Sequence, residues 1–390
     1  MNASFARLAA LLLICPATIN TALFRTHSMT LTPKPGILEI TPYIGGRASV
    51  AGVEKVIKLS SNESPLGPSP MAVEALVKAS RDLELYPEGS AKILREAIGE
   101  VYGLDPARIV ASGDGSDALL TMLANAYLRP GDEVLFGAHD FILYKIATLA
   151  NSAIPIEVPD PKLRLDVDAV LARVTPKTRI VFVANPNNPT GSYITHEEMR
   201  RLHAGLSPDT LLVIDAAYSE YVRKNDYEPG IEMVSHYPNV VMTRTFSKIH
   251  GLAGMRIGWT YAPASVCDVL NRIRGPVTVS MMQQYAAAAA IRDRAHVERS
   301  VAHNEQWKNY LTEEIRKLGL KVNESVGNFI LIQFPKGEKG ATQADAFLGA
   351  RGLILRGVAG YGLPDALRLT VGTAEANERV VAALRDFMER

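Results

Sequence analysis

The sequence predicts an α/β protein in which a mainly parallel, doubly wound sheet is joined to a second, smaller α/β domain. Two observations predict this class. Short apolar runs alternate with stretches of helical periodicity over roughly residues 70–275, which is the pattern of strand–helix–strand units around a parallel sheet. After about residue 280 a long helical stretch interrupts this alternation, and the shorter elements that follow it favour a separate domain.

The elements of the first part follow one another in a regular order. Its helices are expected at 70–80, 91–102, 116–128, 141–150, 196–205 and 263–274. Its strands are short apolar runs, expected at 107–111, 133–136, 153–157, 179–184, 211–215 and 239–243. Because such strands alternate with helices, the sheet should be mainly parallel, with helices on both of its faces.

The second part begins with the long helical stretch at 281–317, which is one helix or two. The elements after it are expected to be a strand at 328–334, a helix at 343–351, strands at 353–356 and 366–371, and a terminal helix at 374–389. This order of elements indicates a smaller domain of mixed helices and strands.

Composition excludes several classes of function. Of the 390 residues, 47% are hydrophobic and 21% are charged, which excludes a mainly disordered or fibrous chain. The 42 basic and 41 acidic residues leave a net charge of +1, which gives no support for nucleic-acid binding. Two cysteines cannot build a disulfide framework, and the eight histidines show no metal-binding spacing, so no metal site is expected.

The N-terminal segment allows two interpretations. Residues 8–24 carry no charge and resemble a short secretory signal, but Pro16 and Asn20 interrupt the apolar run. The run is also shorter than the ~20 apolar residues of a membrane span, so no membrane association is expected. We therefore expect a cytoplasmic protein whose functional chain starts near Met29, with residues 1–28 as a dispensable upstream extension. Export is the alternative.

Polar segments follow four of the predicted strands. They are SGDGSD at 112–117, NPNNPTG at 185–191, Asp215 with Tyr218, and RTFSK at 244–248. In open α/β sheets, ligands bind at the carboxyl ends of the strands. One edge of the sheet is therefore expected to gather a helix N-terminus, an amide, a carboxylate, a phenol and a lysine, with Arg256 close behind in the chain.

The GDGSDA segment at 113–118 has more than one interpretation. It matches the G-x-G-x-x-A pattern of a dinucleotide-binding turn, although it lies over 100 residues into the chain. Glycines in either setting let the backbone approach a ligand, and the helix N–H groups at 116–118 can hold a phosphate. A simple helix cap at Ser116 is the structural alternative.

Ser247-Lys248 followed by Arg256 is a more specific signal. A lysine at a strand end, flanked by small residues and a second cation, suits a Schiff base with an aldehyde cofactor, because both surroundings lower its pKa. Asp215 at a buried strand end needs a partner, and a pyridinium nitrogen would supply one. The structural alternatives are a surface lysine, a helix cap at Asp215 and a turn residue at Asn188.

Together these segments resemble the fold-type I pyridoxal-phosphate aminotransferases, and most closely the histidinol-phosphate aminotransferase family. The resemblance extends over essentially residues 29–390. The matching segments are Thr41-Pro42-Tyr43, SNESPLGPSP (61–70), YPEGS (86–90), GDGSDA (113–118), NPNNPTG (185–191), DAAY (215–218), RTFSK (244–248) with Arg256, and LRLTVGT (367–373).

The resemblance implies an aspartate aminotransferase-like fold and a domain division. An N-terminal arm at 29–66 would contribute to the small domain. The large domain, which binds pyridoxal 5′-phosphate, would span 67–275, and the small C-terminal domain would span 276–390.

The resemblance also implies roles at the cofactor. Lys248 would be the Schiff-base lysine and the base for the 1,3-proton shift, Asp215 would keep the pyridine nitrogen protonated, and Tyr218 would hydrogen-bond the ring hydroxyl oxygen. The other cofactor-binding residues would be Asn188 at that same oxygen, Ser116, Asp117, Ser247 and Arg256 at the phosphate, and Phe141 stacked on the ring.

At the substrate, Arg368 would bind a carboxylate, while Arg356 and Tyr43 would hold the substrate phosphate and close the site, with Asn188 also in contact. Tyr86 would reach the cofactor phosphate of a neighbouring subunit, which implies a homodimer. Two guanidinium groups suit a pocket that must accept both a phosphate ester and glutamate, since each can hold an anion bidentately.

The expected function is therefore a transaminase of histidine biosynthesis, which converts histidinol phosphate and 2-oxoglutarate to imidazole-acetol phosphate and glutamate. The nearest rival function is an aromatic amino acid aminotransferase acting on phenylalanine or tyrosine. Three further functions are compatible with parts of the sequence, namely a decarboxylase of phosphorylated threonine, a cofactor-binding regulator without catalysis, and a nicotinamide dehydrogenase.

Overall fold

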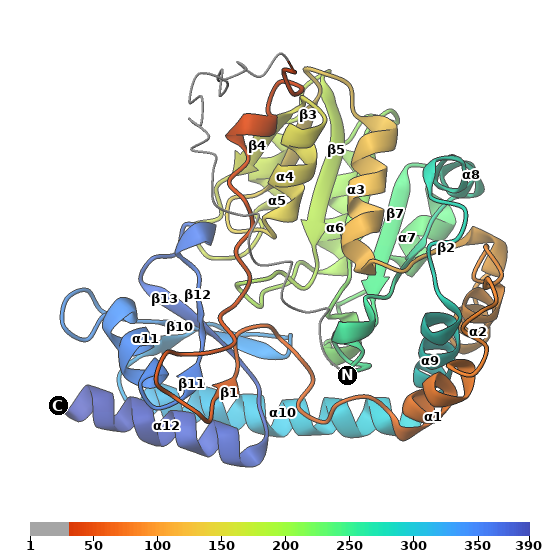
Figure 1. Cartoon of the computed structure of the whole chain (residues 1–390). Helices are drawn as coiled ribbons and strands as arrows, with labels where there is room; N and C mark the ends of the chain where they lie inside the picture. The colour runs from red at the N-terminus through yellow and green to blue at the C-terminus, as the bar shows by residue number, and fades with distance from the viewer. Residues whose placement is uncertain (1–30) are drawn as a thin grey trace, which may run out of the picture. The chain divides into compact units, whose positions relative to one another are not determined.

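A computed structural model describes residues 31–390 (Figure 1). Pro35–Arg390 form one compact unit, and Met1–Lys34 are a separate unit, of which residues 31–34 are described and lie outside helices and strands. The predictions for residues 1–28 and for the start at Met29 fall outside the described residues. No helix within residues 31–390 is long and apolar enough to cross a membrane.

A seven-stranded sheet, in the order β2-β8-β7-β6-β5-β3-β4, forms the centre of the larger part. All neighbours are parallel except β8, which is antiparallel to both β2 and β7. The strands are β2 (Ile109–Ser112), β3 (Glu133–Gly137), β4 (Ile154–Val158), β5 (Thr178–Ala184), β6 (Leu211–Asp215), β7 (Val240–Thr245) and β8 (Gly258–Tyr261). The predicted mainly parallel sheet is confirmed.

Helices cover both faces of this sheet (Figure 1). One face packs against α2 (Lys92–Tyr102), α5 (Val167–Leu171), α6 (His196–Ala204), α7 (Ile231–His236) and α9 (Met281–Arg292). The other face packs against α3 (Gly115–Tyr127), α4 (Leu143–Ala150) and α8 (Ala264–Ile273). Neighbouring strand residues point to opposite faces, as Val181 and Phe182 of β5 do, so the strands are apolar along their whole length.

A four-stranded antiparallel sheet, in the order β12-β13-β10-β9, forms a second core (Figure 1). Its strands are β9 (Lys321–Val322), β10 (Phe329–Gln333), β12 (Arg356–Gly357) and β13 (Ala366–Thr370). They pack against α10 (Arg294–Lys317), α11 (Ala341–Gly349) and α12 (Ala374–Glu389). Beside it, β1 (Ile57–Lys58) pairs in parallel with β11 (Leu353–Ile354), so a segment of the N-terminal arm adds to this part. The domain boundaries at 66/67 and 275/276 stay predictions.

The structure differs from the expected elements in two respects, and it decides between one helix and two at 281–317. It adds β8, which the sequence did not predict. Gly258–Tyr261 is short and follows a glycine-rich segment, so it shows no clear strand periodicity. It also adds the short α5, α7, β1 and β9. The long helical stretch is two helices, since the side chain of Asp293 accepts from His296 N and caps α10. The remaining helix, α1 (Pro70–Ala79), starts with Pro70 behind the capping residue Ser69.

Candidate active site

A cavity of about 390 Å³ opens at the carboxyl ends of the parallel strands, between the two sheets. Its walls include most of the residues singled out from the sequence, which are Tyr43, Ser116, Asp117, Phe141, Asn188, Asp215, Tyr218, Ser247, Lys248, Arg256 and Arg368. The structure does not bring Tyr86 and Arg356 to this wall. The polar residues that follow the predicted strands therefore do gather at one edge of the sheet, where they line a cavity.

Lys248 follows β7 and ends in the cavity. Its ammonium has one acceptor within the described residues, the carbonyl oxygen of Ser61 at 3.3 Å, and lies 5.6 Å from the centre of the Tyr218 ring. Burial lowers the pKa of the Lys248 amine to about 8, and the nearby charge of Arg368 acts in the same direction. A sizeable fraction of Lys248 is therefore a neutral amine near pH 8, which is the nucleophilic form.

Asp215 is the last residue of β6 and is buried. Tyr144 donates its hydroxyl to Asp215 Oδ2 at 2.9 Å, and Thr243 Oγ1 lies 3.4 Å from Oδ1. Burial raises the pKa of Asp215 to about 6, against the opposing effect of the Tyr144 hydrogen bond. Within residues 31–390 this carboxylate forms no salt bridge, so a cationic N–H in the cavity would be a favourable partner.

Arg256 lies beside the first turn of α3 and is held from several sides. Its guanidinium donates to Asp117 Oδ2 at 3.1 Å and to Ser247 Oγ at 3.3 Å. A Cβ on Gly115 would come within 2.5 Å of Arg256 Nη2, so only glycine, at its positive φ of 71°, lets the guanidinium approach. A cation, a hydroxyl and the N-terminus of α3 thus line the same part of the cavity, an arrangement that can hold an anion such as phosphate.

Tyr218 and Asn188 are fixed by two residues from distant segments. The Tyr218 hydroxyl accepts from Asn62 Nδ2 at 2.9 Å. Asn188 Oδ1 accepts from Arg368, whose guanidinium also donates to the carbonyl oxygen of Ser60 at 2.7 Å. Arg368 Nε is buried without an acceptor in the described structure, and burial lowers the pKa of the guanidinium. This unpaired donor at the cavity wall fits an anionic ligand.

Arg356 lies at the cavity mouth instead of its wall. Its Cα is opposite that of Arg368 in the antiparallel β12–β13 pair, so the two side chains share one face of the sheet. The Arg356 guanidinium donates to the carbonyl oxygen of Ile44 at 2.9 Å and lies 5.8 Å from the centre of the Tyr43 ring. Like charges directly opposite one another are unfavourable, and an anion between the two arginines would remove that cost.

Phe141 and Tyr86 complete the set. Phe141 is half-buried at the cavity and meets Tyr144 edge-on, with ring centroids 6.0 Å apart. Tyr86 is 90% exposed and lies away from the cavity of its own chain. A role at a cofactor would therefore require Tyr86 to reach the site of another subunit.

Sequence reasoning missed three residues at this site. Tyr144 donates to Asp215, and Asn62 donates to Tyr218. Gln283 in α9 donates to the carbonyl oxygens of Gly113 and Met255, and these bonds hold the loop between β2 and α3 in place. Asn62 lies within the SNESPLGPSP segment, so the matching motif could have identified it. Tyr144 and Gln283 could not be found in the same way as the strand-end residues, because neither follows a predicted strand.

Comparisons with known proteins agree with this geometry. The family described as aminotransferase class I and II matches residues 54–384. The histidinol-phosphate aminotransferase of Rhodopseudomonas palustris (strain TIE-1) is 57% identical over 359 residues, which cover 91% of this chain and 98% of that protein. That of Nitrobacter hamburgensis is 57% identical over 360 residues, with the same coverage.

Solved structures agree with these sequence comparisons. The histidinol-phosphate aminotransferase of Sinorhizobium meliloti, in complex with pyridoxal-5′-phosphate, matches with a TM-score of 0.85 and 27% identity, over 93% of this chain and 98% of that one. A double mutant of Thermus thermophilus aspartate aminotransferase matches with a TM-score of 0.75 and 22% identity, over 85% of this chain and 92% of that one, and supports the fold alone.

Proposed function

This chain belongs to the aminotransferase class I and II family, and we propose that it transfers the amino group of histidinol phosphate to 2-oxoglutarate. The products are imidazole-acetol phosphate and glutamate. The observation that carries this proposal is the 57% identity to histidinol-phosphate aminotransferases over nearly the whole chain. The same relatives favour this function over an aromatic amino acid aminotransferase.

Pyridoxal 5′-phosphate is the cofactor of this family, and the cavity has the donor set that it needs. Arg256, Ser247 and the first turn of α3 form an anion site for the phosphate, Asp215 offers a buried carboxylate, and Lys248 offers an amine with a lowered pKa. When bound, the cofactor supplies an aldehyde that takes up an amino group and a ring that withdraws electrons.

Each cofactor-binding residue of the cavity has its own proposed role. We propose that Lys248 attaches the cofactor and moves a proton as a neutral amine, and that Asp215 holds a ring N–H in its protonated form. Tyr218 and Asn188 would bond the ring hydroxyl oxygen, and Phe141 would cover one ring face.

Ser116 and Asp117 would bind the phosphate with N–H groups at the N-terminus of α3. The Asp117 side chain has a different role, because its carboxylate accepts from Arg256. At the substrate, Arg368 would bind the phosphate of histidinol phosphate or the α-carboxylate of glutamate. Arg356 and Tyr43 would hold that same phosphate, or the distal carboxylate of glutamate, from the cavity mouth.

A direct assay tests the function. Purified protein supplied with pyridoxal 5′-phosphate, histidinol phosphate and 2-oxoglutarate should release glutamate, and phenylalanine or tyrosine should be a much poorer donor. A kcat/KM higher for phenylalanine than for histidinol phosphate would contradict the proposal and favour an aromatic aminotransferase.

Attachment of the cofactor should depend on pH. Because the pKa of Lys248 is lowered to about 8, its protonated form predominates at lower pH and the neutral form at higher pH. We therefore expect the rate of reconstitution of the apoprotein, followed by visible absorbance, to rise between about pH 7 and pH 9 with a midpoint near 8. A rate that stays flat up to pH 10 would contradict the assigned environment of Lys248.

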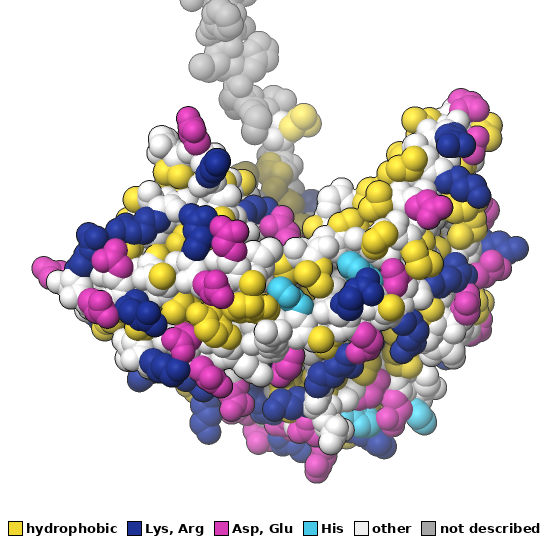
Figure 2. Space-filling view, turned by 90° about the horizontal axis from the view of Figure 1, so that it is seen from below, with side chains coloured by type: hydrophobic (Ala, Val, Ile, Leu, Met, Phe, Trp, Pro, Cys, Tyr) yellow, Lys and Arg dark blue, Asp and Glu magenta, His cyan; other side chains and the backbone are white. Residues whose placement is uncertain are grey.

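We propose a homodimer, and the apolar surface supports it. Exposed hydrophobic side chains gather around α1, the end of α8 and α9, namely Met71, Val73, Val77, Leu83, Leu85, Tyr86, Ile273, Val277 and Tyr285. Figure 2 shows hydrophobic side chains on the projection at its upper right, on the side where α1, α2 and α9 lie in Figure 1. Such a concentration is typical of an interface.

Light scattering measures the assembly directly. We expect a mass about twice the 42.3 kDa of one chain. Val77→Glu should shift the protein toward the monomer, because it introduces a charge on the exposed face of α1. Ile154→Glu, at the edge strand β4, is the matched control and should stay dimeric. A wild-type mass of one chain at micromolar concentration would contradict the dimer.

A further inference from the structure

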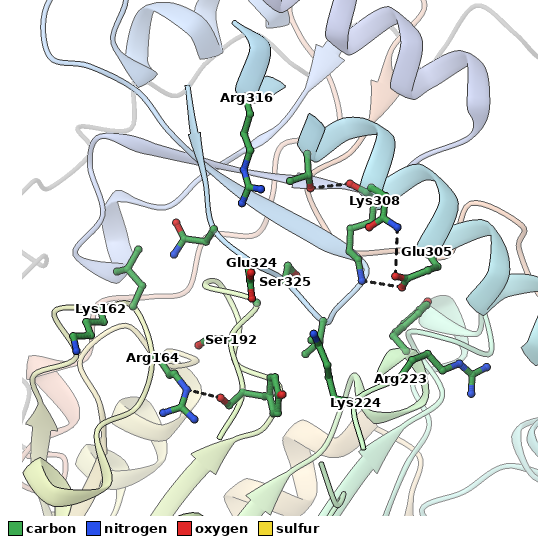
Figure 3. Close-up of a pocket in the computed structure, with 18 residues that line it drawn as sticks. Lys162, Arg164, Ser192, Arg223, Lys224, Glu305, Lys308, Arg316, Glu324 and Ser325 are labelled. Carbon is green, nitrogen blue, oxygen red and sulfur yellow. Dashed lines mark hydrogen bonds and ion pairs between the residues drawn. The ribbon is translucent and has the colours of Figure 1, made fainter. Parts of the chain in front are cut away.

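A second cavity, of about 520 Å³, shares no lining residue with the active-site cavity. Its walls come from the loop before α5, the loop after β5, the segment at 221–224, one face of α10 and the loop between β9 and β10. We call it the basic cleft and define it by its six basic lining residues, Lys162, Arg164, Arg223, Lys224, Lys308 and Arg316 (Figure 3).

Half of these cations have no acidic partner. Lys162, Lys224 and Arg316 have no carboxylate within 4.0 Å in the described part of the chain. Arg316 donates to the carbonyl oxygen of Val322 at 2.8 Å. Figure 3 shows Arg316 from one side and Lys224 from the other around the same space, with Glu324 between them. Among residues 31–390, Glu324 is the one carboxylate lining the cleft that forms no ion pair.

The remaining cations are partly neutralised. Arg164 is held by Glu198, and Arg223 lies 2.6 Å from Glu298. Lys308 is largely buried, with its side chain 9% exposed, and its ammonium has a single acceptor in the described structure, Glu305 Oε2 at 3.2 Å. An ammonium has three donors. A buried Lys308 with one acceptor therefore retains donors that an anion in the cleft can use.

We propose that the basic cleft binds a small phosphate-bearing anion between Lys224, Lys308 and Arg316. Arginine's planar fork and compact ammonium groups are the usual ligands of phosphate oxygens. Glu324 repels the anion and lowers its affinity. Because Lys224, Lys308 and Arg316 outnumber Glu324, a multiply charged ligand gains more from them than a single carboxylate does.

A single chain segment lies between the cleft and the active-site cavity. Val326 N donates to the carbonyl oxygen of Gly191 at 2.9 Å, which joins the β9–β10 loop to the segment that carries Asn188. Gly191 lies so close to Ser325 that a Cβ there would collide with it. Asn188 accepts from Arg368 on the other side of this segment. The segment at 185–191 therefore separates the two cavities, with Gly191 lining the cleft and Asn188 lining the active-site cavity.

Isothermal titration of the cofactor-loaded enzyme with inorganic pyrophosphate tests the site. Saturating glutamate is present, so that its carboxylates occupy Arg356 and Arg368 and no second phosphate compound competes for the cleft. We expect Lys224→Ala/Arg316→Ala to weaken binding at least about tenfold, and Glu324→Gln to strengthen it several-fold. The control Lys336→Ala/Arg379→Ala makes the same charge change on the exposed surface and should bind like wild type.

Two readouts separate this proposal from the proposed function. Without pyrophosphate, the cleft variant should keep kcat within about twofold, since none of its residues line the active-site cavity. Equal loss of binding in the control variant, or no binding of pyrophosphate once glutamate is present, would overturn the basic cleft as a site. Tighter binding of citrate than of pyrophosphate at equal ionic strength would overturn its assignment to phosphate.

Discussion

Lys248→Ala should abolish transamination, with kcat below about one thousandth of the wild-type value. No other amine lines the active-site cavity among the described residues, and the Lys248 amine is the one whose pKa is lowered to about 8. On the proposed roles, the variant would lose both the covalent attachment point and the group that moves the proton. Glutamate release from histidinol phosphate and 2-oxoglutarate measures the loss.

Lys248→Arg is the matched control for the cation alone. It keeps a positive charge near Ser61 and Tyr218 but cannot attach an aldehyde and stays protonated. Both variants should therefore lack the visible band that borohydride abolishes in the wild-type protein. Turnover of Lys248→Ala within tenfold of wild type would exclude Lys248 as the attachment residue, and activity in Lys248→Arg would show that charge suffices.

The site was predictable where chemistry follows directly from the position of strands. Ser116, Asn188, Asp215 and Lys248 each come just after a short apolar run, and parallel strands end at one edge, so sequence order alone brings these residues together. The small-domain side was harder. Arg368 lies within β13, and its approach to Asn188 depends on how two sheets pack.

The supporting residues depend on tertiary structure that periodicity does not encode. Asn62 adopts a positive φ of 55° and donates to a tyrosine 156 residues away, a contact that its motif alone does not predict. Tyr144 lies inside α4, where a buried aromatic is typical of ordinary core, and its ring stacks on Phe182 at 4.7 Å. Only the fold reveals that its hydroxyl reaches Asp215.

Arg356 and Arg368 should differ in how they select substrates. Arg368 is buried and already bonds Asn188 and Ser60, whereas Arg356 is partly exposed and reaches the mouth through Tyr43. Arg368→Ala should lower kcat/KM about 100-fold for every amino donor, because it removes a buried guanidinium that would bind any anionic substrate. Arg368→Lys should recover only part of this loss, because a point charge replaces a fork.

Arg356→Ala should instead discriminate between donors. A dianionic phosphate held between the two arginines loses one charge-assisted bidentate partner, worth ~1.5–3 kcal/mol, so kcat/KM for histidinol phosphate should fall ~10–100-fold. Phenylalanine carries a single carboxylate and no phosphate, so its kcat/KM should fall little. The variant also loses the repulsion between Arg356 and Arg368 across β12–β13. Steady-state kinetics with both donors decides the matter. Equal losses would mean that Arg356 shapes the cavity mouth in general, and no loss for either donor would make it a surface residue and raise the aromatic aminotransferase above the histidinol-phosphate assignment.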